Sequence, residues 1–493
     1  MDSPENSEEI HMKLKDLLNN IPVLETNADL ETEITGVCYD SRKASDGCLF
    51  VAISGFASDG NRFIPMAMEK GAAVVVTAKK PLADVPYVLV ENDRLALALI
   101  GTNLYGHPAE AMTLIGVTGT NGKTSTTLLL KQVLEQCLGA KVGLIGTMSN
   151  LIGDEELPTE RTTPESLELQ ELFAKMRDAG CTHVVMEVSS HALTLHRVGG
   201  VHFDVAAFTN LTEDHLDFHK TMDDYCDAKA ELFARCDKAV INVDDNYAPR
   251  MLERADCEVL RTSAYEADLY AKDAVLHSEG VAFTAVCDGE EVAVSLPIPG
   301  KFTVYNALSV LGIAKQLGVS IAHCAGALKN VQGVKGRMEV VPTPGMPYSV
   351  LIDYSHTPDA LENVISSVQD FCQGRVITVF GCGGDRDPIK RPIMGEIGVK
   401  LSDIAVITSD NPRTEDPEAI IRDIVAGVKS EYGMYKVVCD RRSAIRYAMD
   451  IAEKDDIIIL AGKGHETYQE INGVKHHLDE REEVAAHLLE LGN

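Results

Sequence analysis

The sequence is short of positive charge. Lys and Arg total 45 residues against 75 Asp and Glu, which gives a formal net charge of -30 over 493 residues. This sign is wrong for a protein that holds nucleic acid through its phosphates or that docks on an anionic membrane. If the substrate is anionic, the cationic groups that hold it must be local and metal ions must help, because the overall field repels it.

Paired cysteines and long apolar runs are also missing. The 12 cysteines are scattered without a CxxC pair in a chain too large to need disulfide cross-links. We therefore expect buried or free thiols in a reducing compartment, without a structural zinc site. No stretch approaches about 18 consecutive apolar residues, and the N-terminal MDSPENSEEI has no apolar signal region. These features predict a cytoplasmic protein with no membrane insertion.

What is present is the composition of an ordinary globular protein, with 45% hydrophobic and 24% charged residues. Its length predicts about three domains. Pro- and Gly-rich segments at 106–108 and 342–347 each precede a strongly apolar strand and place the boundaries. The predicted domains are a small α/β domain over residues 1–107, a second over 108–338 and a third over 339–493.

Apolar strands alternate with helical stretches in the second and third domains. This alternation predicts an α/β fold with doubly wound, mostly parallel sheets, in which ligands sit beyond the carboxyl ends of the strands. A β-rich insert is expected at roughly 256–298. The predicted strands are 72–77 in the first domain, 112–119, 141–147, 182–190, 204–211 and 238–245 in the second, and 376–384, 404–412, 435–440 and 456–464 in the third.

The segment GVTGTNGKT at 116–124 lies between an apolar strand and a predicted helix. Leu130, Val133, Leu134, Cys137 and Leu138 define an apolar face of that helix by their spacing. Glycines allow close backbone approach and the helix N-terminus offers free N–H groups, so this segment is typical of a phosphate-binding loop. Lys123 would meet the terminal phosphates and Thr124 would ligate Mg²⁺. Val117 stands where the strict GxxxxGK[ST] spacing has its first Gly, and the bland alternative is a glycine turn.

Three further residues have the right chemistry but are ambiguous alone. Glu187 closes a strand, where a carboxylate can reach the metal of a nucleotide or can simply be solvated. His215 lies in NLTEDHLDFH, which could bind metal or transfer protons, or could be a polar surface loop. Lys229 shares a predicted helical face with apolar residues. It would ordinarily snorkel to water, but a neutral amine there could react with CO₂ to form a metal-binding carbamate. That face comprises Tyr225, Leu232, Phe233 and Cys236.

Later motifs are individually consistent with turns and caps. A dinucleotide-binding fold is disfavoured because GCGGDRD after the 376–380 strand has Arg386 where the fingerprint needs Gly. Hydride transfer is therefore not expected. These motifs are YNAL at 305–308, GRME at 336–339, DYSHTPDAL at 353–361, GGDRD at 383–387, DNPR at 410–413 and GKGHE at 462–466.

Taken in order, these motifs resemble the Mur ligase family nearly end to end, and within it the members that add meso-diaminopimelate. The resemblance also includes DSR at 40–42, DGCLFVAISG at 46–55, ERTTP at 160–164, MEVSSHAL at 186–193 and DAKAELF at 227–233. It implies an N-terminal domain for a uridine nucleotide, a central ATPase and a C-terminal Rossmann-like domain for the amino acid.

The implied reaction is ATP-driven amide formation between UDP-N-acetylmuramoyl-L-alanyl-D-glutamate and meso-diaminopimelate through an acyl phosphate, in peptidoglycan precursor synthesis. ATP and Mg²⁺ are the implied cofactors, and a monomer is expected. Carboxylates are inert to amines at neutral pH, so phosphorylation must activate one of them. By matching position, the resemblance implies Lys123, Glu187, His215 and carbamylated Lys229 (N6-carboxylysine) as catalytic, with Thr124, Glu187, His215 and Lys229 as the metal-binding residues.

The resemblance also assigns the ligand contacts. The residues expected at ATP are Gly119, Thr120, Asn121, Gly122, Lys123, Thr124, Ser125, Asn306, Arg337 and Asp353. Those expected at the UDP-linked substrate are Ser41, Thr162, Thr163, Ser189 and Arg197. Those expected at diaminopimelate are Arg386, Asp410, Asn411, Pro412, Arg413, Gly462 and Glu466.

Diaminopimelate differs from lysine by one extra carboxylate, which a guanidinium at Arg413 would bind with two hydrogen bonds. The alternatives are a lysine-adding Mur ligase, a folylpolyglutamate-type ligase and an inactive P-loop binding module. The DNPR motif argues against the first and the matched N-terminal domain against the second. Retention of Lys123, Glu187, His215 and Lys229 argues against the third.

Overall fold

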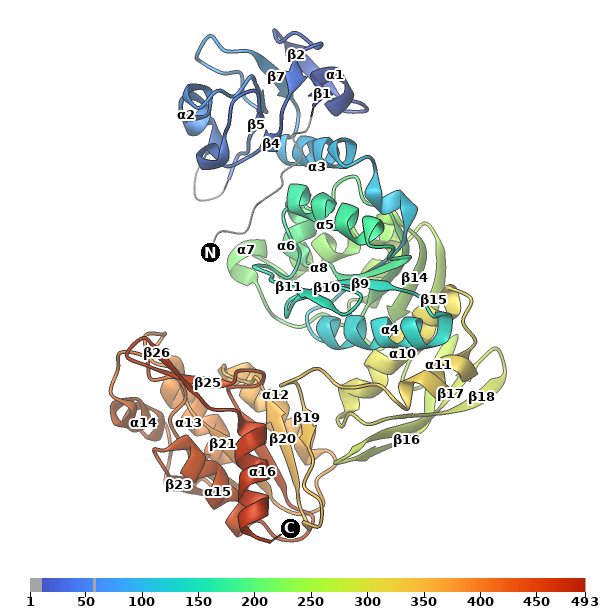
Figure 1. Cartoon of the computed structure of the whole chain (residues 1–493). Helices are drawn as coiled ribbons and strands as arrows, with labels where there is room; N and C mark the ends of the chain where they lie inside the picture. Colours follow the sequence, from blue (N-terminus) through green and yellow to red (C-terminus); the bar gives the residue numbers. More distant parts are fainter. Residues whose placement is uncertain (1–10, 56–58, 493) are drawn as a thin grey trace. The chain divides into compact units, whose positions relative to one another are not determined.

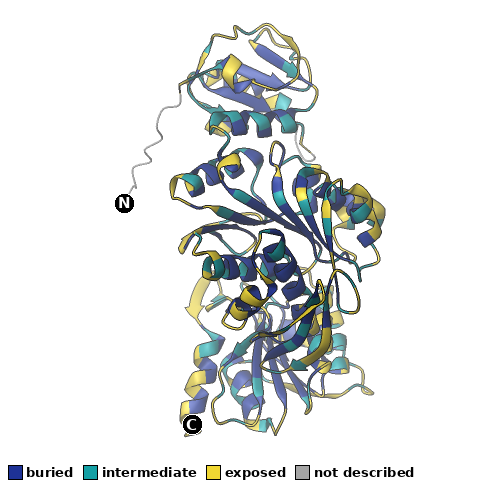
Figure 2. Cartoon of the chain, turned by 90° about the vertical axis from the view of Figure 1, so that its right-hand side faces the viewer, coloured by how far each residue is buried: buried dark blue, intermediate teal, exposed yellow. Residues whose placement is uncertain are grey.

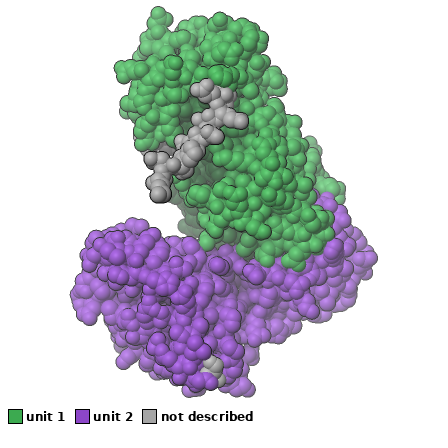
Figure 3. All heavy atoms as spheres, in the orientation of Figure 1, with its two compact units in different colours: residues 1–261 green, residues 262–493 purple. Residues whose placement is uncertain are grey.

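The computed structural model describes residues 11–55 and 59–492. The chain separates into two compact units, Met1–Arg261 and Thr262–Asn493, coloured separately in Figure 3. The N-terminal segment that is predicted to carry no targeting signal lies largely outside the described residues. Within the described ranges, no helix is both long and apolar enough to cross a membrane.

The chain begins with a five-stranded sheet in the order β2-β7-β6-β5-β4 (Figure 1). Every residue of β5 and β6 is buried, and the predicted strand at 72–77 is confirmed as β6. Helix α3 begins after Asn92, whose side chain accepts hydrogen bonds from two backbone N–H groups of the first turn. The elements are β1 Met12–Lys13, α1 Leu14–Leu17, β2 Val23–Thr26, β3 Glu33–Ile34, β4 Val37–Cys38, η1 Ser41–Lys43, β5 Leu49–Ala52, η2 Gly60–Phe63, α2 Ile64–Glu69, β6 Val74–Thr77, β7 Tyr87–Val90 and α3 Asp93–Leu104.

The rest of the first unit is built on parallel strands in the order β9-β12-β8-β13-β14. All five correspond to predicted strands, and their carboxyl ends lie at one edge of the sheet. An unpredicted antiparallel hairpin, β10-β11, extends the β9 side. The elements are η3 Pro108–Ala111, β8 Thr113–Thr118, α4 Lys123–Leu138, β9 Val142–Ile145, β10 Asn150–Ile152, β11 Glu155–Leu157, α5 Ser166–Asp178, β12 His183–Glu187, α6 Ser190–Thr194, β13 Phe203–Phe208, α7 Leu216–His219, α8 Met222–Ala230, η4 Phe233–Arg235, β14 Cys236–Asn242 and α9 Ala248–Arg254.

Two details of the predicted helices are wrong. Leu130, Val133 and Leu134 are buried on α4 as expected, but Leu138 is exposed because the helix ends there at Gly139. Helix α8 ends at Ala230, so Leu232, Phe233 and Cys236 follow it in a short 3₁₀ turn and strand β14 and do not share a helical face with Lys229. The apolar character of that stretch comes from the strand that it enters.

The second unit opens with the predicted β-rich insert. Strand β15 includes Arg261 and Thr262, between which the two units divide, and its last two residues pair with β16. Strands β16, β17 and β18 form an antiparallel meander. Helix α10, which carries Asn306, packs against β16 and β17. The elements are β15 Glu258–Ser263, β16 Leu269–His277, β17 Gly280–Cys287, β18 Glu290–Leu296, α10 Lys301–Gln316 and α11 Ile321–Leu328.

The C-terminal sheet has six strands in the order β19-β20-β24-β21-β22-β23, parallel except for β19. Its inner strands are buried, whereas the covering helices turn exposed faces outward (Figure 2). The predicted third-domain strands are confirmed, and the fold class is the predicted α/β with mostly parallel sheets. The elements are β19 Glu339–Val341, β20 Ser349–Asp353, α12 Pro358–Gln369, β21 Val376–Phe380, α13 Lys390–Leu401, β22 Ile404–Ile407, α14 Pro417–Val425, β23 Met434–Val437, α15 Arg441–Ile451, β24 Ile457–Ala461, β25 Tyr468–Ile471, β26 Val474–His477 and α16 Glu480–Glu490.

Candidate active site

The predicted phosphate loop connects β8 to α4, and two of its glycines are structurally required. Gly119 has φ +150° and Gly122 has φ +84°. A Cβ on Gly119 would lie only 1.9 Å from Oγ1 of Thr209. The Thr120 N–H donates to the carbonyl oxygen of Asn210 at 2.8 Å and the Asn121 N–H to its Oδ1 at 2.9 Å, so the segment after β13 fixes the loop.

Gly119→Ala is expected to displace the loop and to lower nucleotide affinity on the order of a hundredfold, because the new methyl overlaps Thr209 and disfavours the native φ. Calorimetric binding of ATP checks this. The matched control is Gly139→Ala at the other end of α4, where φ is also positive but no atom lies within 4 Å of the added Cβ. The control should lose some stability and keep its nucleotide affinity, and equal binding by both variants would contradict the account.

Thr124 and Glu187 come together at the carboxyl edge of the sheet. Oγ1 of Thr124 donates to Oε1 of Glu187 at 2.9 Å. Both Glu187 oxygens also accept hydrogen bonds from Thr147, one from its N–H at 3.0 Å and the other from its hydroxyl at 3.0 Å. Glu187 is 1% exposed. A buried carboxylate beside a loop hydroxyl is the oxygen donor set that a hard divalent cation prefers.

Two lysines converge on the same loop. Nζ of Lys123 donates to the carbonyl oxygens of Gly119 and Thr120, both at 2.8 Å. Nζ of Lys229, on α8, also donates to the Gly119 carbonyl at 2.8 Å. Lys229 is 1% exposed, so the predicted alternative in which it snorkels to water is wrong. Burial lowers the pKa of Lys229 well below its ordinary value, and the charge of Lys123 lowers it further.

His215 lies at the start of α7 with φ +54° and donates its backbone N–H to Asp214. Its ring is 6.0 Å from the ring of Tyr225, over which Nζ of Lys229 lies at 4.6 Å. Sequence reasoning gave no role to two neighbouring histidines. The His191 ring lies 4.9 Å from that of His215, and burial lowers the pKa of His219 to about 4. Both histidines lie in motifs of the sequence, His191 in MEVSSHAL and His219 in NLTEDHLDFH, and those motifs were the signal that could have identified them.

Four of the five residues predicted for the UDP-linked substrate lie together in the first unit. The Thr162 hydroxyl is 3.0 Å from that of Thr147, and Thr163 donates to the Glu187 carbonyl at 2.8 Å. The Ser189 N–H donates to Thr163, and the Arg197 guanidinium reaches the Thr163 carbonyl at 3.2 Å. Arg197 also pairs with Glu165 at 2.9 Å. Ser41 is separate from this group, buried in η1 with its hydroxyl 3.4 Å from Sδ of Met66.

The remaining predicted ATP contacts lie in the second unit. Asn306 is buried on α10. Asp353 ends β20, where it accepts hydrogen bonds from the Met338 N–H at 2.8 Å and from the Ser355 hydroxyl. Burial raises the pKa of Asp353. The Arg337 guanidinium lies 5.4 Å from the centre of the Tyr354 ring.

The residues predicted to bind the amino acid gather at the carboxyl edge of the C-terminal sheet. Asp410 and Asn411 follow β22, whereas Gly462 and Glu466 follow β24. Nδ2 of Asn411 donates to Oε2 of Glu466 at 2.8 Å. Gly462 has φ +116°, and a Cβ there would lie 2.6 Å from Oδ2 of Asp410. The loops after β22 and β24 therefore meet at this edge.

Arg413 has φ +51°, and its guanidinium lies against the neighbouring loop. Nη1 donates to the carbonyl of Gly384 at 2.7 Å, while Nε lies 3.4 Å from Oε2 of Glu470. Its side chain is 21% exposed, so it remains accessible to a ligand. Arg386 contacts the carbonyl of Asp385 at 3.1 Å and is exposed, and the Pro412 carbonyl accepts from the Glu415 N–H.

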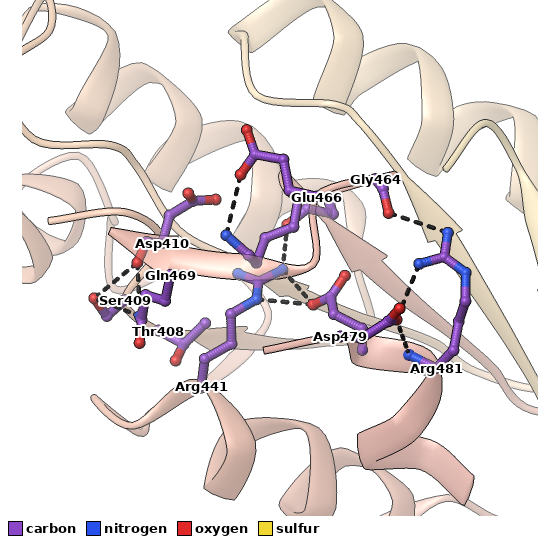
Figure 4. Close-up of polar contacts among 12 residues, drawn as sticks. Thr408, Ser409, Asp410, Arg441, Gly464, Glu466, Gln469, Asp479 and Arg481 are labelled. Carbon is purple, nitrogen blue, oxygen red and sulfur yellow. Dashed lines mark hydrogen bonds and ion pairs between the residues drawn. The ribbon is translucent and has the colours of Figure 1, made fainter. Parts of the chain in front are cut away.

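A buried ion pair beneath these loops was not predicted. Nε of Arg441 donates to Oε1 of Glu480 at 2.8 Å, and both side chains are 0% exposed. Nη2 of Arg441 also donates to the carbonyl of Ala461, the residue before Gly462, at 2.9 Å (Figure 4). Arg441 lies in a helix and Glu480 opens another, positions at which sequence alone suggests exposed charges.

Three family models match consecutive parts of the chain: "Mur ligase family, catalytic domain" over residues 33–103, "Mur ligase middle domain" over 117–314 and "Mur ligase, glutamate ligase domain" over 336–464. The chain belongs to the Mur ligase family. It is therefore a ligase.

Three similar proteins match nearly the whole chain. A UDP-N-acetylmuramoyl-L-alanyl-D-glutamate--2,6-diaminopimelate ligase of Clostridium acetobutylicum is 48% identical, covering 97% of this chain and 100% of its own. The protein of that name from Clostridium tetani is 46% identical with the same coverage. A solved structure of a ligase of that name is 31% identical, with a TM-score of 0.76, and the match covers 98% of this chain and 100% of that one.

Proposed function

We propose that the protein is an ATP-dependent ligase that joins meso-diaminopimelate to UDP-N-acetylmuramoyl-L-alanyl-D-glutamate in peptidoglycan precursor synthesis. The observation that carries the ligase chemistry is the convergence of Lys123, Lys229 and the Thr124–Glu187 pair on one glycine loop. The amino acid is supported by the names of the full-length relatives and by the accessible guanidinium of Arg413.

The loop binds ATP in this proposal. The free N–H groups at the start of α4 face the phosphates, and Lys123 leaves the carbonyls of Gly119 and Thr120 to neutralise the transferred phosphoryl group. The loop residues Gly119, Thr120, Asn121, Gly122 and Ser125 supply backbone or side-chain donors. Asn306, Arg337 and Asp353 contact the rest of the nucleotide, as the family resemblance implies.

The residues present fit two Mg²⁺ ions. Among residues 11–55 and 59–492, no group of three or more His, Cys, Asp or Glu has a metal-binding arrangement, so a hydroxyl or a modified lysine must complete each site. Thr124 and Glu187 would hold one ion, and His215 with a carbamate on Lys229 would hold the second. The burial that lowers the pKa of Lys229 favours its neutral amine and hence the carbamate, because a neutral amine adds CO₂ and releases one proton. When bound, the ions neutralise the charge of the reacting phosphates.

The activated group is the D-glutamate carboxylate of the UDP-linked substrate. Its oxygen takes the γ-phosphoryl group of ATP and ADP leaves, and the amine then attacks the acyl carbon, forms the amide and expels phosphate. Ser41, Thr162, Thr163 and Ser189 bind and orient this substrate, and Arg197 offers a cation to its anionic part. We place the reaction in the cytoplasm and expect a monomer.

The amino acid binds at the second loop cluster in this proposal. The fork of Arg413 pairs with the distal carboxylate of diaminopimelate, which lysine lacks. Arg386 adds positive charge near this position. Asp410, Asn411, Pro412, Gly462 and Glu466 line the remainder. The proposed domains are the predicted 1–107, 108–338 and 339–493. The family models support them with matches over 33–103, 117–314 and 336–464, the last of which begins three residues before the proposed third domain.

The test is ADP formation from ATP and Mg²⁺ with both co-substrates, each omitted in turn. We expect turnover only when UDP-N-acetylmuramoyl-L-alanyl-D-glutamate and an amino acid are both present. ATP binding without turnover under any combination would favour the inactive P-loop module. Turnover with a folate and glutamate in place of the UDP-linked substrate would favour the folylpolyglutamate-type alternative.

A further inference from the structure

Lys463 is completely buried in the middle of the loop cluster formed after β22 and β24. Its side chain is 0% exposed. Nζ donates to Oδ1 of Asn411 at 3.1 Å and to Oε2 of Glu466 at 3.1 Å. The lysine therefore joins two residues that belong to separate loops.

These contacts determine the orientation of Asn411. Its Oδ1 accepts hydrogen bonds from Lys463 and from the Glu470 N–H at 2.9 Å, so its Nδ2 is directed to Glu466. Without the ammonium group, Oε2 of Glu466 would keep only Asn411 as a partner, and a flip of the amide would remove that partner as well. Lys463 therefore fixes the orientation of Asn411 and Glu466, both of which are proposed to bind the ligand.

Asp410 has an unused acceptor in the loop after β22. It is 6% exposed, and its Oδ2 has no hydrogen-bond partner within the described chain. Burial raises the pKa of Asp410, but the charges of Lys463 and Arg441 and the hydrogen bond from the Asn411 N–H, with a smaller effect from His356, outweigh burial and hold that pKa below its ordinary value. The lowered pKa favours the ionised carboxylate at Asp410, which is labelled in Figure 4.

The charged groups around Asp410 are unbalanced by one negative charge. The groups that face it are Lys463 and Glu466 from the loop after β24, Arg441 with its partner Glu480 from below, and His356 from the loop after β20. His356 is exposed to solvent, and among the other groups three carboxylates and two cations leave one negative charge beside the unpaired oxygen. An ammonium group of an incoming amino acid neutralises that charge.

We propose that Lys463 is a positioning residue for the amino-acid substrate: it holds Asn411 and Glu466 in place and keeps Asp410 ready to accept a substrate ammonium group. This inference rests on the proposed function. It assigns Lys463 an effect on amino-acid binding alone, because its partners are Asn411, Glu466 and the ring of Tyr468, none of which is proposed to contact ATP or the UDP-linked substrate.

The test is steady-state kinetics of Lys463→Met, which retains the length of the side chain without its charge. We expect KM for diaminopimelate to rise roughly tenfold to a hundredfold, with KM for ATP and for the UDP-linked substrate unchanged. Loss of the nearby cation raises the pKa of Asp410, so kcat/KM for diaminopimelate should begin to fall at a higher pH than in the wild type as pH is lowered. Lys463→Arg should recover part of the loss.

Lys475→Met is the matched control. Both lysines lie over the ring of Tyr468, Lys463 at 5.6 Å and Lys475 at 4.1 Å, but Lys475 is on the exposed strand β26. The control should behave as wild type. If Lys463→Met does not fold, Lys463→Arg and Lys463→Gln are compared instead. The proposal is supported if the fall of kcat/KM for diaminopimelate at low pH is shifted to higher pH in Lys463→Gln but not in Lys463→Arg.

Two results would overturn the inference: an unchanged KM for diaminopimelate with an unshifted pH profile in a folded variant, or an equal loss for all three substrates. A wild-type enzyme that does not add diaminopimelate would instead refute the proposed function, so the two failures are distinguishable.

Discussion

In Lys229→Ala, we expect the rate of amide formation to fall on the order of a thousandfold. Part of that rate should return when a small carboxylic acid such as acetate is added. The substitution removes the side-chain nitrogen that carries the proposed carbamate. Lys229 is 1% exposed and its Nζ lies 2.8 Å from the Gly119 carbonyl, so truncation leaves a space beside the loop into which a carboxylate can enter. Product formation as a function of acetate concentration is the measurement.

Lys123→Ala serves as the control for this rescue. Its side chain contacts the same Gly119 carbonyl at 2.8 Å, but its proposed role is that of a cation. Acetate should therefore leave Lys123→Ala inactive, whereas a small amine is the matching additive. The carbamate proposal fails if no carboxylate restores Lys229→Ala, or if acetate restores both variants equally.

Arg413→Ala is expected to lower kcat/KM for diaminopimelate on the order of a hundredfold or more, because the distal carboxylate loses a charged partner in a partly buried site. Binding of the UDP-linked substrate should remain intact, since Arg413 and its contacts with Gly384 and Glu470 belong to the C-terminal loops. The measurement is kcat/KM for diaminopimelate beside the calorimetric affinity for the UDP-linked substrate.

Arg422→Ala is the charge-matched control. It removes one guanidinium from α14 that is 67% exposed and lies near Asp416, so solvent already screens it. The control should retain full activity. Unchanged turnover of diaminopimelate by Arg413→Ala would refute the assignment of its distal carboxylate to this residue.

The parts of the site that could be predicted from the sequence depend on glycine conformation and on where parallel strands end. A glycine loop between an apolar strand and a helix has few physical interpretations, and Gly119 and Gly122 both have the positive φ that such a loop needs. Similarly, DNPR and GKGHE each follow an apolar parallel strand. Carboxyl ends of parallel strands share one edge, so the meeting of Asn411 with Glu466 could be expected.

The parts that sequence missed depend on tertiary burial. Arg441 and Glu480 look like exposed helix charges until the packing of α15 and α16 places both at 0% exposure. Lys463 sits between two glycines in a segment that suggests a turn, and only the fold shows that it spans two loops. The helical face assigned to Lys229 failed for a related reason, because the apolar residues after Ala230 enter strand β14.

The most direct test of the central claim is a comparison of the two amino acids in one assay. Phosphate release is measured with ATP, Mg²⁺ and UDP-N-acetylmuramoyl-L-alanyl-D-glutamate, separately with meso-diaminopimelate and with L-lysine, and the product mass is determined. The account predicts release with diaminopimelate and a product heavier than the UDP-linked substrate by one diaminopimelate less one water. Preference for lysine would retain the ligase but contradict the role of Arg413, and release with neither amino acid would contradict the proposed function.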